Sequence, residues 1–244
     1  MSYTFSQALA ALGGAQKAAA RGAPAYSRFV NRRLGRVLAA AAAVVGLTPN
    51  GVTGISALFT FSGIAVLALA PVGLLQGVTV TVLLVLGYAF DSADGQLARL
   101  RGGGSPAGEW LDHVVDSIKV VALPLAVLLA LRRTDLSETV LLVPLAAAVV
   151  QSVSFFTMIL TEQLRRAHGT VPLAASGGAG AWVRTLVAVP TDYGVQCYLF
   201  VLLAWPVAFA WGYGVVVVAS AGYLLLATVK WYREMRGLGR PSAA

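Results

Sequence analysis

The sequence predicts an all-α integral membrane protein with six transmembrane helices preceded by an amphipathic juxtamembrane helix. Of the 244 residues, 58% are hydrophobic and 11% are charged, whereas a soluble globular domain carries about a quarter charged residues. The same composition excludes a disordered chain, which needs low hydrophobicity and high charge. A lone cysteine, Cys197, excludes a disulfide scaffold.

Six stretches are long and apolar enough, or nearly so, to cross a bilayer, which takes about 20 residues. They cover residues 52–72, 77–98, 108–131, 138–161, 194–211 and 213–231. Residues that end helices separate them. These are Pro71 and Gly73 after the first stretch, the three glycines at 102–104 after the second, and Gly212 between the last two.

Residues 26–46 differ from the six spans because four arginines precede an Ala/Val/Leu run. This pattern is typical of an amphipathic helix on the membrane surface, and Pro49 would turn the chain into the first span. We therefore expect an N-terminal cytoplasmic segment over 1–50, one membrane domain over 51–232 and a cytoplasmic tail over 233–244. We find no internal repeat and no second domain.

The net charge of +8 could indicate either nucleic acid or an anionic membrane surface as a partner, and the placement of the charges decides between them. Basic residues gather before the first span, in the second-to-third and fourth-to-fifth connections, and in the tail. They are Lys17, Arg21, Arg28, Arg32, Arg33, Arg36, Arg99, Arg101, Arg165, Arg166, Arg184, Lys230, Arg233, Arg236 and Arg240.

The opposite connections hold only Arg132 and Arg133. By the positive-inside rule, we expect a multi-pass protein of the cytoplasmic membrane with both termini in the cytoplasm. The positive charge then orients the chain in the bilayer, and no nucleic-acid partner is expected.

Acidic residues are concentrated in or beside the second and third spans. Half of the ten lie between positions 91 and 116: Asp91, Asp94, Glu109, Asp112 and Asp116. An aspartate at the centre of a spanning helix costs about 2.5–3.5 kcal/mol, so these residues need compensation. One alternative is a set of structural acids paired with Arg99, Arg101 and Lys119.

The spacing of these acids favours a site. Residues three or four apart share a helix face. Asp91, Asp94, Gly95 and Ala98 therefore form one stripe, and Gly108, Asp112 and Asp116 form another. A short glycine-rich turn joins the two spans, so we expect antiparallel neighbours whose stripes face each other near the cytoplasmic side.

Four carboxylates without histidine or cysteine favour hard cations, Mg²⁺ or Mn²⁺, with Ca²⁺ also compatible. Two dications would balance the four negative charges. Paired metals suit displacement at phosphorus, because they stabilise the attacking and the leaving oxygens. We therefore predict two divalent cations as cofactors.

Residues 91–116 match the pattern D-x2-D-G-x2-A-R-x8-G-x3-D-x3-D at every fixed position. This pattern resembles the signature of the CDP-alcohol phosphotransferase family. Six spans preceded by a surface helix agree with the resemblance, and Thr48-Pro49-Asn50 is similar to the family's usual entry into the first span.

The resemblance implies a homodimeric membrane enzyme that uses two divalent metals to transfer a phosphoryl-linked group from a CDP-activated donor to an alcohol, with release of CMP. The implied metal ligands are Asp91, Asp94, Asp112 and Asp116. Asp116 would also be the general base. The implied CDP-binding residues are Asp94, Gly95, Ala98, Arg99, Gly108 and Asp112.

The leading substrate interpretation is phosphatidyl transfer from CDP-diacylglycerol to a polar alcohol in phospholipid synthesis, at a cytoplasmic active site. The turn at 99–105 is similar to that of actinobacterial phosphatidylinositol-phosphate synthases. Those enzymes usually carry Arg directly after the last aspartate, where this chain has Ser117, and the acceptor is therefore left open.

The alternative is transfer of a phospho-alcohol from soluble CDP-choline, CDP-ethanolamine or CDP-inositol to a lipid or polyol hydroxyl. Residues 105–117 are similar to the choline/ethanolamine phosphotransferases, in which a Glu and a His at the places of Glu109 and His113 help deprotonate a lipid alcohol. Both residues are therefore candidate catalytic groups. Otherwise His113 is a helix-face histidine bonded to a carbonyl or water.

Basic residues at helix ends are candidates for binding the acceptor, or else they anchor the helices at the headgroups. The candidates are Lys119, Arg165, Arg166, Lys230 and Arg233. Lys119 lies within a span and could instead pair with an acid. A cation transporter is the class-level alternative, but transporters often repeat broken helices in two halves, and this chain has a single acid cluster.

Overall fold

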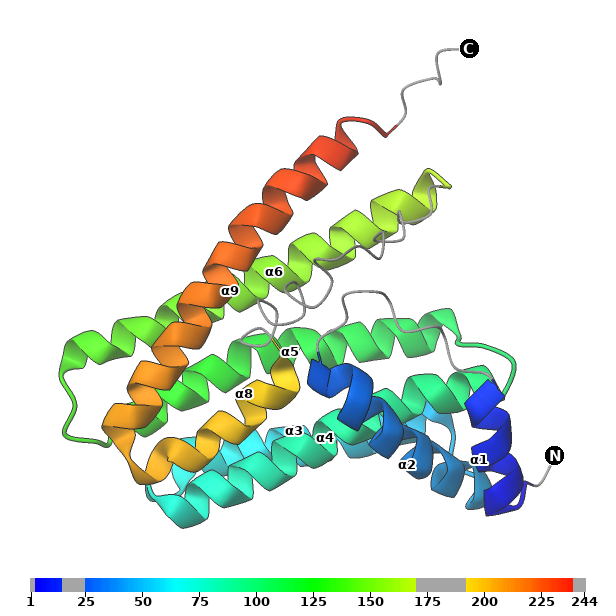
Figure 1. Ribbon diagram of the computed structural model, residues 1–244, viewed down its shortest axis with the longest axis horizontal. Coiled ribbons are helices and arrows are strands. Elements are labelled where there is room, and N and C mark those ends of the chain that lie inside the picture. Colours follow the sequence, from blue (N-terminus) through cyan, green and yellow to red (C-terminus); the bar gives the residue numbers. More distant parts are fainter. Residues whose placement is uncertain (1–2, 15–24, 170–191, 239–244) are drawn as a thin grey trace.

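The computed structural model describes residues 3–14, 25–169 and 192–238, and every regular element within them is helical (Figure 1). The elements, in chain order, are α1 (Phe5–Gly14), the π-helix η1 (Ser27–Asn31), α2 (Arg32–Val44), α3 (Pro49–Leu69), α4 (Leu74–Leu100), α5 (Pro106–Leu131), the 3₁₀ helix η2 (Glu138–Leu141), α6 (Leu142–Ala167), α8 (Tyr193–Leu199), the 3₁₀ helix η4 (Phe200–Ala204) and α9 (Pro206–Met235).

Five helices among the described residues are long and apolar enough to cross a membrane: α3, α4, α5, α6 together with η2, and α9. They confirm the all-helical class, and α3 to α6 correspond to the first four predicted spans. The exposed side chains of α9 include Trp211, Val218 and Leu226, each more than 70% exposed. Such surfaces are typical of helices that face lipid.

The predicted fifth span at 194–211 is wrong in its bounds. The chain there forms α8 and η4 and breaks at Trp205, and α9 begins at Pro206. Proline suits the first turn of a helix, where its missing N–H needs no partner. Gly212, the predicted break, lies inside α9, where an added Cβ would be 2.7 Å from a methyl carbon of Leu199.

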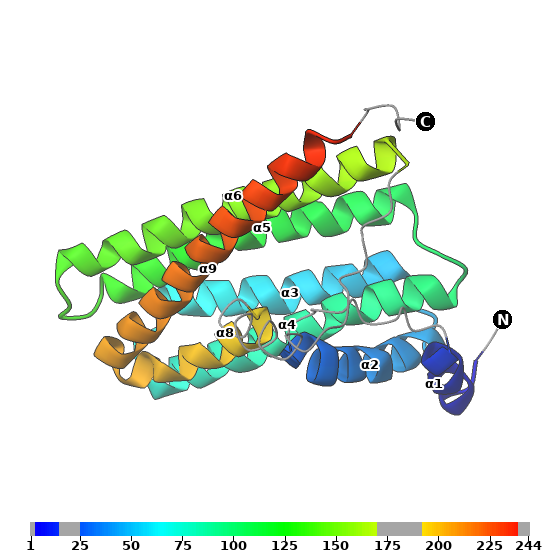
Figure 2. The same ribbon diagram turned by 45° about the horizontal axis from the view of Figure 1, so that its top comes forward.

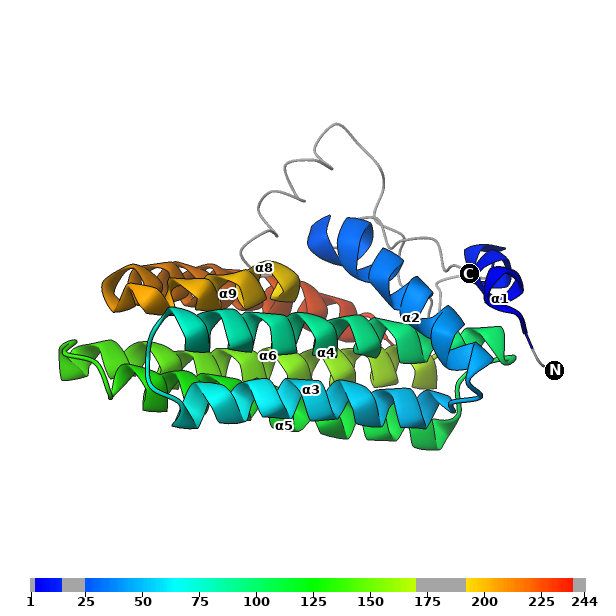
Figure 3. The ribbon, with the colours of Figure 1, turned by 90° about the horizontal axis from the view of Figure 1, so that it is seen from below.

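The helices pack as one bundle in which α3 lies against both α4 and α5 (Figure 3). On the other side of α5 lies α6, which in turn packs against α9 (Figure 2). The prediction that the aspartate stripes of α4 and α5 face each other is confirmed, although the two backbones make almost no close contact. Both helices pack on α3, and the carboxylates of Asp91, Asp112 and Asp116 approach one another across the space between them.

The half of the bundle farther from the aspartates holds the larger hydrophobic core. Its fully buried side chains include Leu67, Leu84, Val127 and Phe209. Side chains also satisfy the carbonyls at the C-terminal end of α3. The amide of Gln76 donates to three of them, and the guanidinium of Arg133 donates to two. Uncapped carbonyls at a helix end are costly when buried.

The helix predicted over 26–46 is present as η1 and α2, which pack against α4 and α1 through small residues. A Cβ added at Gly35 would be 2.6 Å from the Ser92 hydroxyl, so glycine permits this close approach. The Asn31 amide donates to the Tyr88 carbonyl (3.0 Å). Of the basic residues that oriented the chain, Lys17, Arg21, Arg184 and Arg240 lie outside the described residues.

Candidate active site

One end of the bundle, here called the aspartate end, is where α3 and α5 begin and where α4, α6 and α9 finish (Figure 3). Both starting helices are capped in the same way. The Thr48 hydroxyl accepts from the Gly51 N–H (3.1 Å), and the Ser105 hydroxyl accepts from the Gly108 N–H (3.0 Å). A proline follows each cap. Two helix N-termini, with their partial positive charge, therefore lie at this end.

Three of the four predicted carboxylates meet between α4 and α5. Asp91 on α4 and Asp112 and Asp116 on α5 each offer an oxygen, and these oxygens lie within 4.8 Å of one another. All three side chains are half-buried. Like charges this close in a partly buried place repel each other unless a cation lies among them. The oxygen-only donors fit a hard divalent cation.

The fourth carboxylate, Asp94, lies one helical turn after Asp91 and is 8% exposed. The Thr53 hydroxyl on α3 donates a 2.6 Å hydrogen bond to Asp94 Oδ2. A charge-assisted bond of this kind holds the carboxylate in one orientation. Asp94 thus connects α3 to the site, although it is not part of the three-oxygen cluster.

A cavity of about 820 Å³ opens beside the aspartates and is large enough for a nucleotide-sized ligand. Asp94 and Asp112 line it, so the cavity adjoins the carboxylate cluster. Its lining is Thr48, Pro49, Asn50, Thr53, Asp94, Gly95, Ala98, Arg101, Gly103, Gly104, Ser105, Pro106, Gly108, Glu109 and Asp112.

Five of the six predicted CDP-binding residues line this cavity, as their shared stripes predict. Arg99 does not line it: its guanidinium lies 3.5 Å from where a Cβ of Gly95 would be. Arg101 lines the cavity in its place. Arg101 can reach the cavity because α4 ends at Leu100. A residue beyond the end of a helix no longer follows the three- and four-residue spacing of that helix's face.

The turn between α4 and α5 depends on glycine. Gly102 and Gly103 have φ values of +97° and +131°, a backbone region that glycine enters without steric cost. Gly103 and Gly104 also line the cavity. The glycine run therefore both reverses the chain and leaves its own part of the cavity lining without side chains.

Sequence interpretation did not assign Asn50 or Thr53 to the site. Both lie in the first turns of α3, which begins at the aspartate end. The predicted topology could have found them, since it places the start of the first span and the end of the second on the same side of the membrane. Thr53 also follows Pro49 by one helical turn, which puts both on one face.

Lys119 forms an ion pair with Asp116, one turn away on α5, and its ammonium lies 5.1 Å from the centre of the Tyr193 ring. Of the alternatives open for Lys119, the structure therefore shows pairing with an acid. Among the described residues, neither Arg99 nor Arg101 forms an ion pair with the aspartates. Within the described part of the chain, the alternative that the aspartates are structural acids paired with basic residues therefore applies to Asp116 and to none of the other three aspartates.

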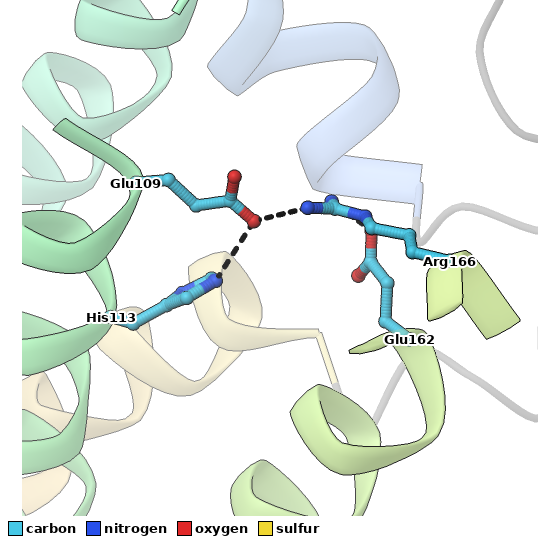
Figure 4. Close-up of polar contacts among 4 residues, drawn as sticks. All are labelled: Glu109, His113, Glu162 and Arg166. Carbon is cyan, nitrogen blue, oxygen red and sulfur yellow. Dashed lines mark hydrogen bonds and ion pairs between the residues drawn. The ribbon is translucent and has the colours of Figure 1, made fainter. Parts of the chain in front are cut away.

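Glu109 lies between His113 on its own helix and Arg166 on α6 (Figure 4). Its Oε1 is 3.7 Å from His113 Nε2 and 2.5 Å from Arg166 Nη1. A second acid, Glu162, accepts from Arg166 Nη2 (2.6 Å). The His113 ring also meets Phe155 edge to face, with ring centres 6.2 Å apart. Glu109 and His113 thus share a face, as their spacing predicts.

Arg165 is held by Glu234 of α9 through two parallel hydrogen bonds of 2.7 Å each. This pair joins α6 to α9 at the aspartate end. The remaining predicted acceptor residues, Lys230 and Arg233, are exposed on the last turns of α9 and do not line the cavity.

Comparison with known proteins agrees with this geometry. The profile of the CDP-alcohol phosphatidyltransferase family matches residues 46–229. The phosphatidylinositol phosphate synthase of Mycobacterium bovis is 31% identical over 198 residues, which cover 81% of this chain and 85% of that one. The enzyme of the same name from Mycobacterium marinum is 40% identical over 97 residues, 39% of each chain.

The fold is also similar to a solved structure, that of the Mycobacterium tuberculosis phosphatidylinositol phosphate synthase with CDP-DAG bound. The TM-score is 0.54 at 23% identity, and the match covers 83% of this chain and 94% of that one. Membership in a transferase family excludes the cation-transporter alternative. The match over residues 46–229 shows that this chain belongs to the CDP-alcohol phosphatidyltransferase family.

Proposed function

We propose that this chain transfers a phosphatidyl group from CDP-diacylglycerol to the hydroxyl of a polar alcohol and releases CMP, as a step of phospholipid synthesis. Family membership and the relatives named phosphatidylinositol phosphate synthase support this assignment. The observation that carries it is the three-oxygen carboxylate cluster beside a nucleotide-sized cavity, because a diphosphate donor needs both a cation site and room for its base and sugar.

The carboxylates are proposed to hold two divalent cations, Mg²⁺ or Mn²⁺. One cluster is formed by carboxylate oxygens of Asp91, Asp112 and Asp116. Asp94 would add a fourth carboxylate from the side of the cavity. Bound there, the cations supply charge neutralisation for the donor's diphosphate and stabilise the leaving CMP.

The donor's cytidine and diphosphate are proposed to occupy the cavity. Gly95, Ala98 and Gly108 leave its walls open, since none carries more than a methyl group. Two helix N-termini and Arg101 would attract the diphosphate. Arg99, outside the lining, would support the wall behind Gly95 instead of contacting the nucleotide.

Asp116 is proposed to take the proton from the acceptor hydroxyl. Of the three clustered carboxylates, that of Asp116 lies nearest the middle of α5, two turns beyond Gly108 of the cavity lining. An acceptor would therefore reach Asp116 from the side opposite the nucleotide. Its ion pair with Lys119 would orient the carboxylate, which is a positioning role for the lysine.

One observation favours the second candidate, transfer of a phospho-alcohol from a soluble CDP donor to a lipid or polyol hydroxyl. Glu109 lines the cavity and His113 lies 3.7 Å from it, so these two side chains could relay a proton from a hydroxyl at the cavity rim. In that case both would be catalytic.

The placement in the membrane is also a proposal. We propose a cytoplasmic-membrane enzyme with the aspartate end, both termini and the active site on the cytoplasmic side. Positive residues gather at this end, whereas Arg132 and Arg133 lie at the other. The segment 1–50 would carry α2 on the membrane surface, 51–232 would be the membrane domain and 233–244 the cytoplasmic tail.

The short apolar pair α8 and η4 would form the fifth of the six proposed spans, since it packs against α4 within the bundle, and α9 would be the sixth. A homodimer is proposed from the family resemblance. It would cover part of the apolar surface that α6 and α9 leave exposed.

The test is CMP release by the purified protein with Mg²⁺ or Mn²⁺. CDP-diacylglycerol is compared with CDP-choline, CDP-ethanolamine and CDP-inositol, each with pooled alcohols. Release from CDP-diacylglycerol supports the proposal, whereas release only from a soluble donor would establish the second candidate.

In the same assay, Asp116→Asn is expected to lower CMP release by roughly 10²–10⁴-fold, the usual contribution of a general base. The matched control is Asp135→Asn, an exposed aspartate beyond the end of α5, which should leave the rate unchanged. Near-normal turnover by a folded Asp116→Asn protein would contradict the assignment of the base.

A further inference from the structure

The arginines of α6 lie beside the site, yet each is already neutralised by carboxylates of this chain. Arg166 contacts Glu109, a residue of the cavity lining, and Glu162 at the same time. Arg165 makes a two-bond pair with Glu234. Among the described residues, three glutamates thus pair with the two arginines of α6, and each guanidinium already has a carboxylate partner.

Arg165 and Glu234 form a bidentate ion pair. The Arg165 side chain is only 17% exposed, and both of its bonds to Glu234 measure 2.7 Å. This is the parallel geometry in which arginine otherwise grips a phosphate or carboxylate ligand. A ligand that bound these same two N–H groups would have to displace Glu234, and that carboxylate would lose its bidentate partner.

Lys119, the third basic residue beside the site, is also already paired with a carboxylate. It pairs with Asp116 and lies over the Tyr193 ring, with a side chain 15% exposed. Lys230 and Arg233 are exposed on the last turns of α9 and outside the cavity lining, where basic residues typically anchor a helix among lipid headgroups.

A phosphorylated alcohol would bring up to two further negative charges to this place. Two dications would offset only the four aspartates, and Arg101 and the helix N-termini lie on the nucleotide side. Among the described residues, an acceptor that approached along α6 would meet Glu109 and Glu162 with the arginine between them already paired. Repulsion between like charges would then oppose its binding.

We propose that the acceptor of this enzyme is an alcohol that carries no phosphate, and that Glu109, Glu162 and Glu234 exclude phosphorylated alcohols by neutralising Arg165 and Arg166. The inference rests on the proposed function. It holds equally for the second candidate, in which the acceptor would be a lipid or polyol hydroxyl. It also separates this chain from relatives whose named product carries a phosphate on inositol.

The first experiment uses alcohols in pairs that differ only by the phosphate: glycerol with sn-glycerol 3-phosphate, and myo-inositol with its 1-phosphate. CMP release from CDP-diacylglycerol is measured with Mn²⁺ for each, and binding of each phosphorylated member to the full-length protein is measured by calorimetry. We expect no phosphorylated member to exceed its partner in CMP release, and none to bind saturably.

Faster release with a phosphorylated member than with its partner, or its saturable binding to the wild-type protein, would overturn the inference. Binding of CDP-diacylglycerol is measured alongside, because it tests the proposed function separately. Absence of donor binding would contradict the proposed function, whatever the alcohols do.

The second experiment removes the neutralising acids without touching the cavity lining. In the double variant Glu162→Gln with Glu234→Gln, sn-glycerol 3-phosphate should inhibit CMP release at concentrations about tenfold below any that inhibit the wild type, equivalent to about 1.4 kcal/mol of binding free energy. The matched control, Glu138→Gln, removes an exposed acid at the far end of α6 and should not change this inhibition.

Equal inhibition of the double variant and the wild type would show that the glutamates do not control access of phosphate, and would overturn the inference. The double variant could also lose the contact between α6 and α9. Its thermal unfolding is therefore compared with that of Arg165→Gln, which loses the same pair but offers no cation. Stronger inhibition in Arg165→Gln as well would trace the effect to loosened packing and likewise overturn it.

Discussion

The four aspartates of the site contact different neighbours, and these contacts indicate different roles. Asp94 is buried and held by Thr53, Asp116 is paired with Lys119, and Asp91 and Asp112 have oxygens close to that of Asp116. A carboxylate fixed by a hydroxyl from another helix keeps one orientation, which suits a group that contacts both a cation and a nucleotide.

An isosteric substitution tests what the Thr53 hydroxyl contributes to donor binding through its hydrogen bond to Asp94. Thr53→Val removes the bond to Asp94 but keeps the volume, so we expect the KM for CDP-diacylglycerol to rise about tenfold, since a hydrogen bond to a charged group contributes about 1.5–3 kcal/mol. Steady-state CMP release measures it.

The control for this change is Thr157→Val, because the Thr157 hydroxyl donates only to carbonyls of its own helix, α6. An unchanged KM in Thr53→Val would show that Asp94 is oriented without the threonine.

At the scale of elements, glycines set how closely the helices approach α4. A Cβ added at Gly87 would lie 3.1 Å from the Thr60 backbone nitrogen and 3.2 Å from the Ser56 carbonyl oxygen of α3. The Ser56 hydroxyl also donates to the Gly87 carbonyl (2.8 Å). Small residues at such crossings are the usual means of joining helices in membranes.

Gly87→Ala is therefore expected to destabilise the protein by about 1–3 kcal/mol, the usual range for overpacking. Thermal unfolding in detergent measures it. Gly54→Ala is the control, since a Cβ there meets nothing within 4 Å in the same helix pair and should stabilise by about 0.5–1 kcal/mol through helix propensity. Equal unfolding temperatures for Gly87→Ala and the wild type would contradict the tight crossing.

At the scale of the whole molecule, α4 and α5 both pack on α3, and their carboxylates face each other across the remaining space. Their mutual repulsion opposes folding unless it is compensated. A cation that binds only the folded chain would therefore stabilise the bundle as well as the reaction.

Mn²⁺ at about 100 times its dissociation constant should raise the free energy of unfolding by about 2.7 kcal/mol, seen as a higher unfolding temperature that EDTA reverses. Asp112→Asn should reduce this shift, because it removes a carboxylate shared by the cluster and the cavity. A shift of the same size in Asp112→Asn would place the stabilising cation elsewhere.

Local patterns in the sequence predicted the helices and most of the site. Apolar length predicted α3, α4, α5, α6 and α9, and the spacing of three and four residues predicted which aspartates and glycines share a face. These features depend on residues within a few turns of one another, so the geometry of a single helix determines them.

Only the tertiary structure decided which faces meet and which charges are paired. It packed both α4 and α5 on α3, brought Thr53 and Arg101 to the cavity, and paired Arg165 with Glu234, 69 positions away. It also moved the last helix break to Trp205. The physical reason is that packing and ion pairing join residues from different helices, and their positions relative to one another follow from the shape of the whole bundle rather than from any local repeat.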